Sequence, residues 1–173
     1  GLAGAARTAS AQDLEPPRSR QGYYMGFGID YLLNNNWEGG EGTGLWTGGG
    51  FNLSVGQLIT RRFGLGLLIE SGSASGKRDQ AGIGGLSLDA HYAIAGNLAF
   101  HLGSGVGFLN INPRDGSDDG ETRGTAGAYY LTGLRYDLFP FKRLTGGLAV
   151  TPNVRVRYLP GDTQAFVALF SVD

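Results

Sequence analysis

Several features that would place this chain in common protein classes are missing from its sequence. The 173 residues include no cysteine, which excludes disulfide bonds and thiolate metal sites. No stretch approaches the ~20 uninterrupted apolar residues of a membrane helix, and none shows a sustained 3.6-residue period. The net charge is −1 and there is no basic run, so the electrostatic footprint of a nucleic-acid-binding protein is absent.

Glycine, in contrast, is abundant. The chain has 32 glycines, which is ~18% of its residues against a usual ~7%. They are spread through the apolar segments rather than gathered in a linker, and the apolar content of 41% is too high for a disordered chain. The composition therefore indicates one folded domain.

The segment from Leu45 to Ser71 shows the pattern that the rest of the chain repeats. Apolar side chains such as Leu53 and Leu67 alternate along it with glycine and small polar residues. A period of two predicts β-strands, because successive side chains leave a strand on opposite sides. The glycine-rich face is too small for an ordinary solvent-exposed face. It suits the interior of a narrow barrel whose apolar side meets lipid.

The pattern predicts eight strands, most of them long enough for the ~9–11 residues of a tilted membrane strand. Long polar connections are expected after the first, third and fifth strands, and short turns after the second, fourth and sixth. A sheet that spans a membrane must close, because an unpaired edge cannot lie in hydrocarbon. The predicted fold is an all-β, eight-stranded, antiparallel, up-and-down transmembrane β-barrel, with strands at 22–33, 45–59, 63–71, 81–94, 98–111, 124–139, 144–158 and 164–173.

From about Gly22 to its end, the chain resembles the small outer-membrane barrels of the OmpA/OmpX type. The resemblance rests on the number and alternation of strands and not on a sequence motif. It implies a bacterial outer-membrane location with both termini in the periplasm and the longer loops outside the cell. One departure is that such barrels usually end on an aromatic residue, whereas this sequence ends on Asp173.

Residues 1–21 are predicted to lie outside the barrel, which leaves 22–173 as the barrel domain. Ala9, Ser10 and Ala11 match the small-residue cleavage pattern of a secretory signal. A flexible N-terminal segment is the other interpretation, and the sequence does not choose between them.

Aromatic residues toward the strand ends predict the girdles that flank the apolar band of a membrane barrel. The predicted girdle residues are Tyr23, Tyr31, Trp46, Tyr92, Tyr130, Tyr136 and Phe139.

An eight-stranded barrel is only wide enough for side chains to fill it, and charges buried there must be paired. Strand direction places one set of charges toward the loops and another toward the short turns. The sequence therefore predicts two interior clusters, which are Asp30 and Glu70 with Arg155 and Arg157, and Asp89 and Asp137 with Arg135 and a histidine, His91 or His101.

The sequence contains residues of two further kinds of candidate site, a catalytic serine–histidine pair and a calcium loop. Ser87 and His91 share the inward face, but at ~3.4 Å per residue they lie ~13 Å apart, too far for a catalytic hydrogen bond. The loop at 112–123 matches the first half of a calcium-binding loop, although Ala126 replaces the acid expected at the twelfth position. The half motif consists of Asp115, Ser117, Asp119 and Glu121.

The leading functional hypothesis is a non-enzymatic outer-membrane barrel without a cofactor, calcium at the half motif aside. It would contact outer-membrane lipid, and its loops or N-terminal segment would bind another envelope protein. The alternatives are a narrow channel for ions or small solutes, a lipid-modifying enzyme, and a soluble lipocalin-like barrel. A lipocalin would carry its apolar side chains inside, which is the reverse of the assignment made here.

Overall fold

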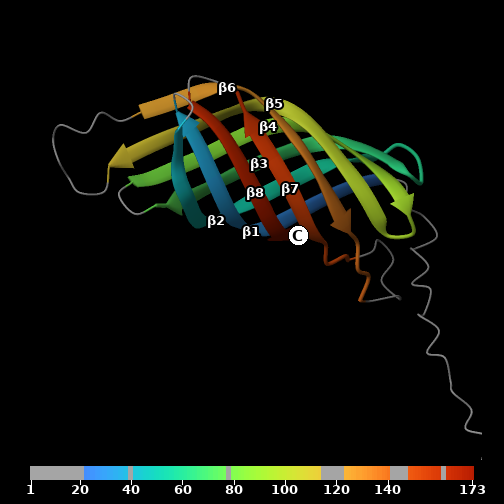
Figure 1. Cartoon of the computed structure of the whole chain (residues 1–173). Coiled ribbons are helices and arrows are strands. Elements are labelled where there is room, and N and C mark those ends of the chain that lie inside the picture. Colours follow the sequence, from blue (N-terminus) through green and yellow to red (C-terminus); the bar gives the residue numbers. More distant parts are fainter. Residues whose placement is uncertain (1–21, 39–40, 77–78, 114–122, 141–147, 161–162) are drawn as a thin grey trace, which may run out of the picture.

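The computed structural model describes residues 22–38, 41–76, 79–113, 123–140, 148–160 and 163–173. All of its regular structure is β (Figure 1). The strands are β1 (Gly22–Glu38), β2 (Glu41–Leu58), β3 (Phe63–Ser75), β4 (Asp79–Ala95), β5 (Leu98–Pro113), β6 (Arg123–Tyr136), β7 (Pro152–Leu159) and β8 (Thr163–Val172).

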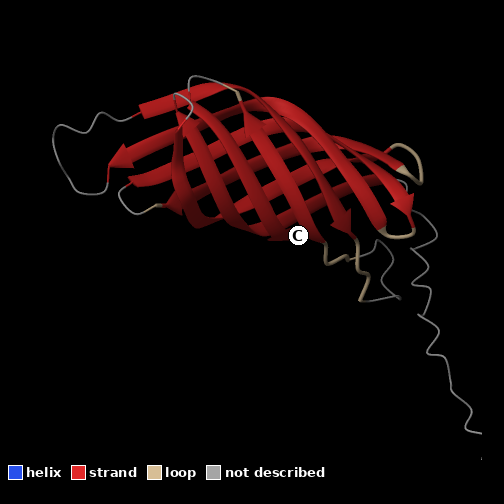
Figure 2. Cartoon of the chain, viewed as in Figure 1, coloured by secondary structure: helices blue, strands red, loops and turns tan. Residues whose placement is uncertain are grey.

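Each strand pairs antiparallel with the next one along the chain, and β8 pairs with β1 to close the barrel. The register shows that the strands are tilted. A path that leaves β1 at Tyr23 and follows paired residues across all eight strands returns to β1 at Leu33. This stagger is what closure of a small barrel requires, and the strands cross obliquely in Figure 2. The eight-stranded, antiparallel, up-and-down fold is confirmed.

The two ends of the barrel differ. We call the end where β2 joins β3, β4 joins β5 and β6 joins β7 the turn end, and the opposite end the loop end. Gly22 also lies at the turn end (right in Figure 1). At the turn end the tightest connection, between β4 and β5, passes through Gly96, whose φ of 52° lies in the left-handed region that favours glycine.

The predicted alternation of long and short connections is wrong. Polar segments expected to form loops are instead paired strand: β1 and β2 are 17 and 18 residues long and are separated only by residues 39–40. A hairpin ladder satisfies the backbone N–H and C=O groups whatever the side chains are, so the polar sequence does not end the strand.

The sixth and seventh strands also differ from their predicted bounds. β6 ends at Tyr136, three residues before the predicted end. β7 begins at Pro152, so residues 148–151 of the predicted seventh strand lie before it, and residues 144–147 lie outside the described part of the chain. The β6–β7 ladder runs only from Tyr130 to Arg135, followed by an isolated bridge between Leu138 and Val150. Pro152 lies where the ladder stops, and proline has no N–H to donate to it.

The outer surface is apolar, as the alternation predicts. Met25, Phe27, Leu102 and Val106 are exposed on it, whereas their chain neighbours point inward. Because the strands are tilted, Tyr31 and Tyr130 lie at about the same height along the barrel axis. Tyr23, Tyr92 and Tyr136 lie at a second height, nearer the turn end. About eight residues of strand separate the two heights, ~20 Å along the axis of a barrel tilted by ~40°. Polar and small residues such as Ser73 and Asn110 follow toward the loop end.

Two residues expected in the aromatic girdles do not lie on the outer surface. Trp46 is only 3% exposed and packs inside the barrel, because it has the same strand parity as the inward Asn52. Phe139 is half-buried, follows the end of β6 and lines an interior cavity at the turn end. The other five, Tyr23, Tyr31, Tyr92, Tyr130 and Tyr136, are exposed.

No helix among the described residues has the length and apolar character needed to cross a membrane.

Glycines on the inner face allow neighbouring strands to approach closely, which gives a stability prediction. A Cβ at Gly105 would collide with the backbone of Leu86 and Ser87, whereas a Cβ at Gly127 would meet open space. We expect Gly105→Ala to lower the free energy of unfolding by about 1–3 kcal/mol, the usual cost of overpacking. Gly127→Ala should have little effect. Urea titration of the folded barrel measures both, and equal effects would contradict the prediction.

Candidate functional site in the barrel interior

The charges predicted to lie toward the loops come together around Arg155. Its guanidinium Nη2 donates to Asp30 Oδ1 at 2.7 Å, and its Nη1 lies 3.1 Å from Glu70 Oε1. All three side chains are almost completely buried. One cation therefore serves two carboxylates from strands β1 and β3, and it holds these strands and β7 to a common centre.

Arg157 completes this group, which we call the loop-side cluster. Its Nη1 lies 3.9 Å from Glu70 Oε2, and its Nη2 donates to the carbonyl oxygen of Gly84. The guanidinium also stacks on Tyr129 at 4.2 Å from the ring centroid. A Cβ at Gly85 or Gly107 would meet this arginine and tyrosine, so the two glycines make room for the stacked pair.

Neutral polar side chains that lie outside the predicted cluster extend the loop-side cluster toward the turn end. Asn52 donates to both Asp30 Oδ1 and Asp173 Oδ1 at 3.0 Å, and Asn153 donates to Asp173 Oδ2 at 2.7 Å. Ser171 donates to Asn153 and accepts from Arg155. Their inward parity was the only available signal, because hydrogen-bond partners on distant strands depend on the register.

The charges predicted to lie toward the short turns form two separate pairs, which we call the turn-side pairs. His101 Nδ1 lies 3.0 Å from Asp89 Oδ1, and Arg135 Nε donates to Asp137 Oδ1 at 2.9 Å. His91 makes no hydrogen bond through Nδ1. Its ring instead lies between aromatic neighbours, with centroids 5.4 Å from Tyr24 and 5.6 Å from His101.

An apolar layer fills the interior between the loop-side cluster and the loop end. On each strand its members lie nearer the loop end than the inward charges. The sequence predicts only small and polar groups on the inward face. Each strand contributes only one or two residues to the layer, so the alternation along any single strand does not reveal it. The layer contains Leu32, Trp46, Ala74, Ala81, Ile83, Leu109, Leu159 and Val167.

The serine and histidines that the sequence places on the inward face are not joined by hydrogen bonds. Ser87 Oγ hydrogen-bonds to no histidine, and the Nε2 atom of His101, on the far side of its ring from Asp89, makes no hydrogen bond. Among the side chains that can be described, no group of three or more acids or histidines has the arrangement of a metal site. The half calcium motif at Asp115, Ser117, Asp119 and Glu121 lies outside the described residues.

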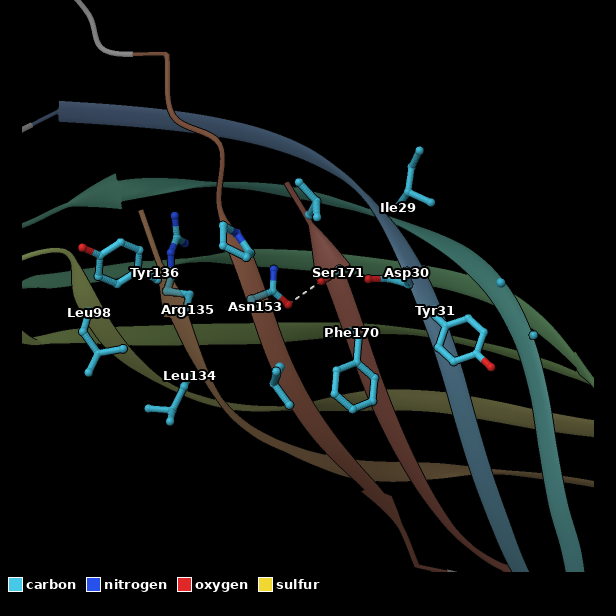
Figure 3. A pocket seen from close by; sticks show the side chains of 15 residues that line it. Ile29, Asp30, Tyr31, Leu98, Leu134, Arg135, Tyr136, Asn153, Phe170 and Ser171 are labelled. Carbon is cyan, nitrogen blue, oxygen red and sulfur yellow. Dashed lines mark hydrogen bonds between the residues drawn. The ribbon is translucent and has the colours of Figure 1, made fainter. Parts of the chain in front are cut away.

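The outer surface carries a shallow apolar groove of about 810 Å³ that is lined by residues of β1, β2, β5, β6, β7 and β8. Figure 3 shows Ile29, Tyr31, Leu134 and Phe170 around it, with Asp30 and Arg135 behind the strands. Its apolar lining is continuous with the rest of the apolar belt.

Comparison with known proteins agrees with this geometry at the level of the fold. No protein-family model and no curated protein matches the sequence. Among solved structures, Ail of Yersinia pestis bound to the heparin analogue sucrose octasulfate superposes with a TM-score of 0.61 at 14% identity. The match covers 88% of this chain and 97% of Ail.

Neisserial surface protein A is also similar, with a TM-score of 0.59 at 13% identity over 87% of this chain and 97% of that protein. This chain has the fold of the small outer-membrane barrels. At these identities the likeness concerns the fold alone. The small-barrel fold nevertheless accounts for the apolar exterior and the side-chain-filled interior described above.

Proposed function

We propose that this chain is an integral outer-membrane barrel that acts as a closed structural or interaction protein. The turn end would face the periplasm and the loop end the outside of the cell, as is usual for outer-membrane barrels. The main support for the proposal is that the outer surface of the barrel is apolar while its interior is filled with side chains. A soluble lipocalin-like barrel would need the opposite arrangement.

Two features of the interior favour a closed barrel over a channel. The loop-side cluster crosses the interior with direct contacts from Arg155 to both Asp30 and Glu70. Toward the loop end, the described members of the apolar layer include no charged side chain. An ion would have to cross this layer and then break a buried ion pair, and both steps are costly.

The loop end is the proposed contact surface, and its charge bears on the partner. The connections at this end, 38–41, 76–79, 113–123 and 160–163, carry more acidic than basic residues. A sulfated ligand such as the one bound by Ail would be repelled by such a surface. We therefore propose a positively charged surface of another envelope protein or of a host as the partner.

Reconstitution tests the proposal directly. The purified chain should require detergent to remain monodisperse and should migrate as a compact, heat-modifiable form in SDS gels. In planar bilayers it should give no single-channel steps. A soluble monomer without detergent would contradict the membrane location. Steady steps that Glu70→Ala abolishes would instead establish the channel.

A further inference from the structure

Both histidines of the chain lie side by side inside the barrel. The sequence contains only two, His91 on β4 and His101 on β5. They are register partners across the β4–β5 ladder and face inward, and they are only 8% and 7% exposed. Their ring centroids lie 5.6 Å apart. Every imidazole that this sequence can offer to a ligand is therefore collected in one place.

Asp89 determines which nitrogen of His101 carries a proton. A carboxylate only accepts hydrogen bonds, so its 3.0 Å contact with Nδ1 of His101 places the proton on Nδ1. In the neutral ring the lone pair is then on Nε2, and this atom is buried and makes no hydrogen bond. A carboxylate that accepts from the second nitrogen of the ring is the usual outer partner of a metal-ligating histidine.

His91 provides a second open nitrogen. Its Nδ1 is also buried and has no hydrogen-bond partner. Tyr24 packs against the ring edge-to-face at a centroid distance of 5.4 Å, and a Cβ at Gly64 on β3 would collide with the ring. The strands on either side of β4 thus leave the space that this imidazole occupies. Buried polar atoms without partners are costly, and a ligand bound to both nitrogens would remove that cost.

The separation of the two rings fits one shared metal ion. At metal–nitrogen distances of about 2.0–2.1 Å, two imidazoles on the same ion place their ring centroids about 5–6 Å apart. The observed separation of 5.6 Å lies in this range. The two strands therefore already hold the rings at the spacing that a shared ion requires.

The charges around the two histidines also favour a cation. Asp89 contacts His101 directly and adds negative charge next to it. The positive charge of Arg135 is paired with Asp137, because its Nε and Nη2 atoms both lie 2.9 Å from Asp137 Oδ1. A cavity of about 390 Å³ gives an ion a path to the pair, since it is lined by His91 and by Leu58, the last residue of β2 at the turn end.

We propose that His91 and His101 together bind one divalent first-row transition-metal ion, with water completing its coordination. Imidazole suits Cu²⁺, Zn²⁺ and Ni²⁺, and Cu²⁺ binds most tightly to a given set of nitrogen ligands. Mg²⁺ and Ca²⁺ prefer oxygen ligands and should not bind. No third acid or histidine among the described residues completes a metal-binding group, so the ion is expected to exchange rather than to be held permanently.

Copper binding to the folded barrel tests the proposal. The sample is the full chain without a histidine tag, labelled with nitrogen-15 only in histidine, refolded in detergent and checked by its heat-modifiable gel shift. After addition of Cu²⁺ below the protein concentration, pulsed electron paramagnetic resonance should detect two labelled imidazole nitrogens on each bound ion. Zn²⁺ should displace the copper, whereas a roughly hundredfold excess of Mg²⁺ should not.

Three variants assign the binding to the histidine pair. His91→Phe keeps a ring against Tyr24 but removes a ligand, so it should weaken copper binding by at least about tenfold and leave one labelled nitrogen on the ion. Asp89→Asn can donate to Nδ1 of His101 and so place the proton on Nε2. It should weaken binding by about 10–100-fold, the usual effect of losing an outer partner.

Ser87→Ala is the matched control, because Ser87 lies on the same strand and face as Asp89 and is equally buried. This variant should bind copper as the unaltered chain does. A spectrum with one labelled nitrogen or none in the unaltered chain would overturn the proposal. So would equal copper affinity of the unaltered chain and His91→Phe, or displacement of the copper by Mg²⁺, since both results would place the ion on carboxylates.

Discussion

Replacing Arg155 by methionine should lower the free energy of unfolding by about 3–5 kcal/mol, the cost of leaving buried charges without their partner. Arg155 is the shared cation for Asp30 and Glu70, and all three groups are removed from water. Methionine retains much of the side-chain volume, so the loss would come from the unpaired carboxylates rather than from a cavity. Urea unfolding of the barrel in lipid vesicles measures the change.

Two further variants separate the electrostatic cause from general damage. Combining Arg155→Met with Asp30→Asn removes one buried carboxylate and leaves Glu70 paired with Arg157, so it should restore most of the lost stability. Arg61→Met removes an exposed arginine and should have little effect. If Arg155→Met lowered the free energy of unfolding no more than Arg61→Met does, the loop-side cluster would not be a major source of the barrel's stability.

Trp46→Ala is the second substitution with a large expected effect, about 3–5 kcal/mol of lost unfolding free energy. The indole is only 3% exposed and belongs to the apolar layer. Leu45→Ala is the control, since Leu45 is the adjacent residue but faces outward and is exposed. Similar losses for the two variants would contradict the interior position of Trp46.

Fluorescence gives a second measurement of the same residue. The chain has two tryptophans, so Trp37→Phe leaves Trp46 as the single emitter. Brominated lipids quench side chains that touch the bilayer, and an interior Trp46 should be little affected by them. Strong quenching would mean that Trp46 contacts the bilayer and belongs to the aromatic girdle, as the sequence alone predicts.

The facing of the side chains is the part of this fold that local sequence predicts well. Alternation along each strand correctly separates Met25 and Leu102 on the outer surface from Asp30 and Glu70 inside. This succeeds because a strand has a fixed period of two, so one buried charge or one glycine-rich face sets the orientation of every residue on it.

The ends of the strands are predicted poorly. Asn34 and Ser73 have polar side chains of the kind found in loops, yet both lie within long paired strands. Pairing depends on the backbone and on the neighbouring strand rather than on these side chains. Conversely, the late start of β7 at Pro152 depends on which strand is opposite it.

The sequence by itself determined the number of strands, their facing and the sets of charges that share each half of the interior. Tertiary structure decided which of those charges touch. Arg155 forms ion pairs with both Asp30 and Glu70. Asp89 pairs with His101, and Arg135 pairs with Asp137. Tertiary structure also created the apolar layer. These features depend on the stagger between strands, and stagger is a property of the closed barrel that no single strand encodes.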